Sequence, residues 1–145
     1  MDFNETGGRR YLRILAVRKF TGSGFEKELS FLAVVDILYL FTAAASKRDR
    51  IGARWIGSVA LPDDKVYVRT ADGLFLTKFD NLEEILHRLD SFLRIHNSIA
   101  LNETKIKGAT LNTRTKQITV QAGQTREWLK VARRRLPDLE QNFGI

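Results

Sequence analysis

Short runs in which apolar and polar residues alternate follow one another along most of the chain. Alternation with a period of two is typical of strands that bury one face. It predicts strands over 11–20, 28–33, 34–41, 56–61, 65–70, 74–79, 106–111, 117–121 and 126–132. In the run 34–41, one face is expected to carry Ile37, Tyr39 and Phe41. Turn signals such as Ala71-Asp72-Gly73 separate the runs, which favours antiparallel pairing.

Only one segment has the clear spacing of a helix. From 80 to 89, apolar residues recur every three or four positions, and Asp80 or Asn81 can cap the start. A second, short helix is expected at the C-terminus, with Pro137 in its first turn. A βαβ fold would need more helices, so the pattern predicts a mostly β fold of small antiparallel sheets with a short helix at about 80–89.

The run from Phe92 to Asn102 differs from a strand built only for a core. Its apolar residues share one parity and therefore one face: Leu93, Ile95, Ile99 and Leu101. Its centre is polar and rich in hydrogen-bond donors and acceptors: His96, Asn97 and Ser98. We expect the segment to enter a core, surface with a polar tip, and re-enter.

The net charge of the chain indicates which kind of partner this tip could bind. The chain has a formal charge of +7 and a pI near 10. Nine bases lie between 105 and 135 against one acid, Glu127, so the remainder of the chain is close to neutral. A regional positive field favours polyanions, either nucleic acid or an anionic membrane surface.

Several classes of protein are disfavoured by what the sequence lacks. It has no cysteine, no secretory signal and no apolar run near the ~20 residues that span a bilayer. His87 and His96 have no third partner at metal spacing, and Gly22-Ser23-Gly24 lacks the rest of a phosphate-binding motif. We expect a cytoplasmic protein that is not an enzyme, needs no cofactor and does not insert into membranes. A flexible N-terminus (1–8) and one domain (9–145) are expected.

Five segments then resemble, in order, those of one known family. Residues 35–39 are similar to an early DIxYI strand, 66–73 to a central hairpin, and 82–86 to a helix. Residues 92–102 resemble the diagnostic run FxRxHxSxxVN, and 131–134 resemble a late VSRR. The family is the LytTR-type DNA-binding domain of bacterial transcriptional regulators, here as a stand-alone domain without a receiver.

The resemblance implies an elongated β fold that binds DNA through loops in successive major grooves. The matching positions are the loop after the Tyr39 strand, the tip at 96–98, and Arg133. The chain departs from the family in three places. Phe41 or Thr42 stands in place of an acid, Ala132 stands where serine is usual, and the loop 42–64 is long.

Each candidate contact has a local alternative. The Asn97 amide can bond an adenine edge, or it can cap the turn. His96 can contact DNA or hold the loop through the backbone, and Arg94 can reach a phosphate or stay solvated.

Basic residues elsewhere complete the expected contacts. The Arg133 guanidinium suits guanine O6 and N7, whereas Arg134 and Arg135 suit phosphates. Lys130 belongs to the same basic segment, and Lys47, Arg48 and Arg50 are expected to line a groove or the DNA backbone. Four aromatic residues are assigned to the core: Trp55, Phe75, Phe79 and Trp128.

Together, these expectations predict that the protein is a sequence-specific DNA-binding transcriptional regulator. Its partners would be double-stranded DNA with repeated half-sites and a second protomer on that DNA. The alternative is a protein-interaction module, or a regulator held by an inhibitory protein such as a membrane-bound one. Such a protein would bind apolar residues of the long loop: Ile51, Trp55 and Ile56. RNA binding is less favoured, because no aromatic RNA-binding strand is present.

Overall fold

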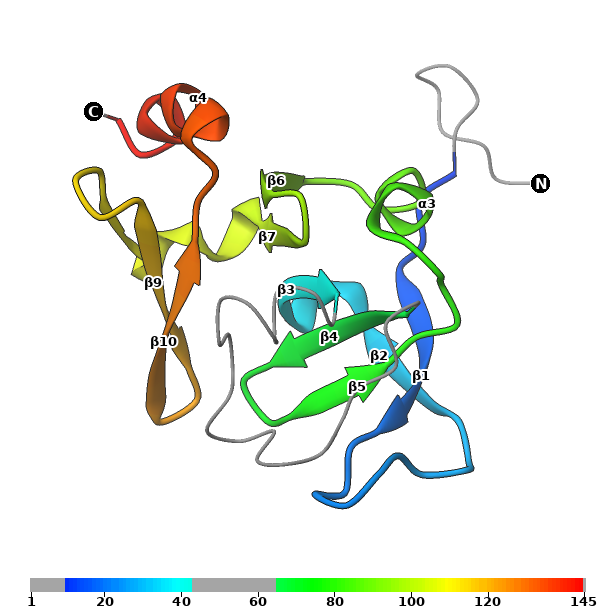
Figure 1. Ribbon diagram of the computed structural model, residues 1–145. Helices are drawn as coiled ribbons and strands as arrows, with labels where there is room; N and C mark the ends of the chain where they lie inside the picture. Colours follow the sequence, from blue (N-terminus) through cyan, green and yellow to red (C-terminus); the bar gives the residue numbers. More distant parts are fainter. Residues whose placement is uncertain (1–9, 43–64, 145) are drawn as a thin grey trace.

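The computed structural model describes residues 10–42 and 65–144, whose strands form two antiparallel sheets (Figure 1). The large sheet has seven strands in the order β2-β1-β5-β4-β3-β7-β6. In that order, they are Ser30–Ala33, Ile14–Lys19, Leu74–Leu76, Val66–Thr70, Ile37–Thr42, Ile99–Asn102 and Phe92–His96. The small sheet has the order β10-β9-β8, comprising Thr125–Lys130, Gln117–Ala122 and Thr110–Asn112.

Helices are short and few in the described ranges. α3 spans Leu82–Leu86 and α4 spans Leu136–Asn142, with 3-10 turns η1 (Val34–Asp36), η2 (Glu103–Gly108) and η3 (Arg133–Arg135). The Asn81 side chain caps α3 by accepting a hydrogen bond from the Glu84 amide at 2.8 Å. Pro137 lies in the first turn of α4. The expected mostly β fold, with one short helix near 80–89 and another at the C-terminus, is confirmed.

Some local predictions are wrong. The strand expected over 106–111 is largely η2, and β8 begins only at Thr110. The Asn102 side chain accepts from the Thr104 amide at 3.0 Å, which turns the chain before a strand can continue. In β3 an irregularity between Ile37 and Tyr39 moves Ile37 to the opposite face from Tyr39.

Hydrophobic residues cover both faces of the large sheet. One face packs on the small sheet, where Tyr39, Phe41 and Tyr67 meet residues of β9 and β10: Ile118, Val120 and Leu129. The rings of Phe41 and Tyr67 are stacked with their centroids 5.6 Å apart. The other face packs on α3 through its buried residues, Leu82 and Ile85. The predicted apolar parity of 92–102 is confirmed, because its four residues join the first cluster.

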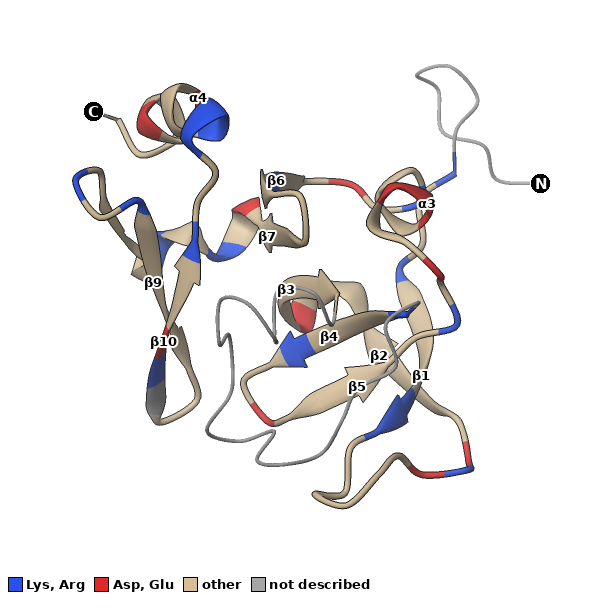
Figure 2. Cartoon of the chain, in the orientation of Figure 1, with Lys and Arg blue, Asp and Glu red and all other residues tan. Residues whose placement is uncertain are grey.

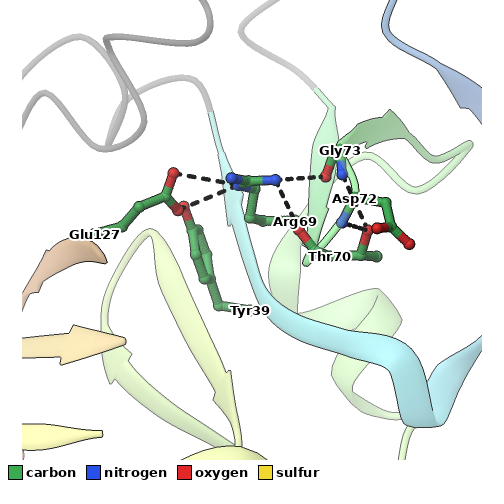
Figure 3. A network of polar contacts seen from close by, with 6 residues as sticks. All are labelled: Tyr39, Arg69, Thr70, Asp72, Gly73 and Glu127. Carbon is green, nitrogen blue, oxygen red and sulfur yellow. Dashed lines mark hydrogen bonds and ion pairs between the residues drawn. The ribbon is translucent and has the colours of Figure 1, made fainter. Parts of the chain in front are cut away.

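A buried polar network also links the two sheets (Figure 3). Glu127 of β10 accepts a hydrogen bond from the Tyr39 hydroxyl at 2.6 Å and pairs with Arg69 Nε at 3.2 Å. The other end of the Arg69 guanidinium donates to the carbonyl of Thr70 at 2.7 Å, within the β4–β5 turn. All three side chains are almost fully buried. The network therefore fixes β10 against β3 and β4.

Candidate nucleic-acid interface

The polar tip is the turn between β6 and β7. The strand pairs continue to His96 and Ile99, so Asn97 and Ser98 form the reversal itself. The imidazole Nδ1 of His96 accepts a hydrogen bond from the Ser98 amide at 3.2 Å. Asn97 is exposed, whereas His96 and Ser98 are half-buried. The expected surfacing of this segment is confirmed, and His96 takes the local role that the sequence left open.

The Arg94 side chain holds the backbone of the tip. Its Nη2 donates to the Asn97 carbonyl at 2.7 Å, and its Nη1 lies 3.4 Å from the Glu83 carboxylate of α3. Its Nε is buried and has no hydrogen-bond partner among the described residues. Arg94 thus faces the turn and the helix, although the sequence left a phosphate contact equally open.

A second segment reaches the tip from the C-terminal region. The Ala132 amide donates to the Ile95 carbonyl at 2.8 Å, which attaches the start of η3 to the end of β6. Nη2 of Arg134 then donates to Oδ1 of Asn97. These two bonds join residues that lie 37 positions apart in the sequence. Arg134 therefore holds the oxygen of the Asn97 side-chain amide, and the amide nitrogen points away from this guanidinium.

The end of β3 forms the third side of this site. The Thr42 amide donates to the Ser98 carbonyl at 3.1 Å, so the chain leaves β3 beside the tip. The predicted contacts Lys47, Arg48 and Arg50 lie outside the described residues, as do Ile51, Trp55 and Ile56. The expected N-terminus (1–8) and the 56–61 strand also lie outside them.

The remaining predicted bases differ in their surroundings. Arg133 is exposed, and no hydrogen bond of its side chain is found within the described ranges. Arg135 is half-buried, with its Nε enclosed and without a hydrogen-bond partner in the described part of the chain. Lys130 is exposed on β10. Of these bases, Arg133 therefore presents the most accessible guanidinium fork.

The assignment of Trp128 to the core is wrong, whereas Phe75 and Phe79 are buried as expected. Trp128 is 42% exposed on β10, between the outward-facing Arg126 and Lys130. Glu127 and Leu129 point inward. Period-two alternation over 126–130 was visible in the sequence and identifies the outward residues, but the aromatic type of Trp128 suggested burial.

The described ranges contain neither a candidate metal site nor a membrane-spanning helix. No group of three or more His, Cys, Asp or Glu side chains there could hold a metal ion. No helix in 10–42 or 65–144 is long and apolar enough to cross a membrane.

Part of the sequence and the fold as a whole are similar to those of known proteins. Residues 51–144 match the model of the LytTr DNA-binding domain family. The solved LytTr DNA-binding domain of a Bacillus cereus response regulator has a similar fold, with a TM-score of 0.54 and 19% sequence identity. The alignment covers 90% of this chain and 98% of that one. No curated protein sequence gives a match. Because the family model covers more than half of the chain, the chain belongs to the LytTR DNA-binding domain family.

Proposed function

We propose that this protein is a transcriptional regulator that binds specific sequences of duplex DNA in the cytoplasm. The observation that carries the proposal is the convergence at one edge of the β6–β7 tip, η3 and the end of β3, in a member of a DNA-binding family. Loops held by a rigid sheet can present side chains to a groove without a recognition helix.

Base reading is assigned to Asn97 and Arg133, which are both exposed. Since Oδ1 of Asn97 accepts from Arg134, its Nδ2 group is the one placed to donate to an acceptor on a base edge, such as a purine N7. Arg133 suits the paired acceptors of guanine. Arg135 is assigned to a phosphate of the half-site and Lys130 to a phosphate beside it. Such contacts position the protein without reading sequence.

A second protomer on a repeated half-site would double these few base contacts. One protomer offers two candidate base readers, and a good bidentate contact discriminates by only about 1–3 kcal/mol. Two protomers on adjacent repeats would therefore raise selectivity to the level that a regulator needs.

Control by an inhibitory protein is a second candidate function, compatible with the first. Three apolar side chains at the β1–β2 end of the large sheet are strongly exposed: Ile14 at 60%, Phe31 at 73% and Val35 at 69%. Exposed apolar residues gathered at one end of a sheet are a common feature of protein-binding surfaces.

Selection of bound duplexes from a random pool tests the DNA-binding function. We expect one enriched half-site and, for ~5 neutralised phosphates, a log–log salt slope of roughly −4.5. On that half-site, Arg133→Ala should cost about 1–3 kcal/mol and relax one base preference. Arg135→Ala should instead weaken binding to all sequences alike. Equal affinity for every duplex at moderate salt would refute sequence-specific binding.

A further inference from the structure

The outer face of the small sheet carries a row of side chains that the tip does not use. Arg126, Trp128 and Lys130 point outward from β10. Their neighbours on β9 are Gln121, Thr119 and Gln117 respectively, all polar. Paired residues of antiparallel strands share a face, so these six side chains form one polar and basic surface.

This surface is free of negative charge in the described part of the chain. Residues 110–130 contain four bases, namely Arg114, Lys116, Arg126 and Lys130, and a single acid, Glu127. Glu127 faces inward and is neutralised by Arg69. Figure 2 shows the resulting basic segments on β10 and in the turn before β9. Because the one acid of 110–130 is buried, the charged side chains of this segment on the outer face are all positive.

The basic row is continuous with the candidate interface. β10 ends at Lys130, and Val131 and Ala132 lead directly into η3. The Val131 amide donates to the Lys116 carbonyl at 2.9 Å, which also holds the basic β8–β9 turn beside this junction. From Arg126 to Arg133 an extended chain covers about 23 Å. Because phosphates of one DNA strand recur every ~3.4 Å along the axis, this length matches roughly seven base pairs.

We propose that the outer face of β10 is a second DNA contact, which binds backbone phosphates that flank the half-site. This inference rests on the proposed function and extends it beyond the tip. Arg126 and Lys130 supply the charges, and the indole N–H of Trp128 supplies a donor between them. A protein partner fits less well, because Trp128 is the one large exposed apolar residue of the described small sheet, and protein interfaces need an apolar centre.

Two duplexes carrying the selected half-site test the proposal: a core duplex, and one extended by about seven base pairs on each side. The double variant Arg126→Gln/Lys130→Gln is compared with Lys27→Gln/Lys78→Gln, which removes two exposed charges from loops next to the large sheet. On the extended duplex, the first variant should lower the magnitude of the salt slope by ~1.8 relative to the control, since two phosphate contacts are lost. On the core duplex, the two variants should have equal slopes.

Equal slopes on the extended duplex, at unchanged thermal midpoints, would overturn the proposal. An equal loss on both duplexes would also overturn it, because the contact would then lie within the half-site. A different result would refute the proposed function. In that case the wild-type protein would bind the selected half-site no more tightly than a scrambled duplex. The slope difference can still be measured on an extended scrambled duplex, so the two ideas fail separately.

Discussion

Arg94 contacts both the β6–β7 tip and α3. Its two hydrogen-bonding ends are directed to the Asn97 carbonyl and to Glu83, and its Nε is enclosed. We predict that Arg94→Gln weakens specific binding by about 1 kcal/mol, because the tip loses a brace. The slope of log K against log salt should stay unchanged, since no phosphate contact is removed. Fluorescence anisotropy titrations at several salt concentrations measure both quantities.

Arg135→Gln provides the comparison, because Arg135 is assigned to a phosphate and its loss should reduce the slope by ~0.9. If Arg94→Gln reduced the slope as much as Arg135→Gln does, the bracing role would be wrong.

At the scale of single residues, the sequence identified the polar tip but could not indicate which side chain contacts it. The bond between Arg134 and Asn97 joins positions 37 residues apart, and no local pattern reports such a contact.

Among the elements, the β9–β10 turn shows how closely the two sheets approach. Gly123 has a φ of +65°, and a Cβ placed on it would lie 2.6 Å from the Ala71 carbonyl oxygen in the β4–β5 turn. Gly123→Ala should therefore lower the free energy of unfolding by about 2 kcal/mol or more, through backbone strain and displacement of the neighbouring turn. Urea denaturation monitored by tryptophan fluorescence gives this value.

Gly22→Ala is a matched control, because Gly22 also has a positive φ, of +95°, but meets nothing within 4 Å. Its cost should reflect backbone strain alone and be smaller. Comparable losses in the two variants would mean that the contact with Ala71 adds nothing to stability.

The sequence largely predicted which segments form strands or helices. It was less accurate about where each element begins and ends, and about which face a residue occupies. Alternation and turn residues located most of the described strands, and the 3.6-residue spacing located α3. The capping bond of Asn102 and the irregularity in β3 were missed, since each depends on one local hydrogen bond or one extra residue that leaves apolar spacing nearly unchanged.

For the whole molecule, the relative placement of the two sheets depends on a buried network that no sequence pattern predicted. Burial, followed by the negative charge and hydrogen bond of Glu127, raises the pKa of Tyr39 well above its ordinary value of 10.0. The Tyr39 proton is thus retained in the folded protein at a pH where the unfolded chain releases it. Stability from this proton is complete below pH 10 and declines as the pH rises further.

Tyr39→Phe tests this coupling between the sheets. Near pH 8 the variant should be less stable by about 1.5–3 kcal/mol, because the hydrogen bond to the charged Glu127 is lost. Above pH 10 the wild-type protein should lose stability relative to the variant, by up to about 1.4 kcal/mol per pH unit, since only the wild type has this proton to release on unfolding. Urea denaturation of both proteins between pH 8 and 11 measures the difference. A constant difference across that range would show that the hydroxyl of Tyr39 does not contribute its proton to the docking of β10 on the large sheet.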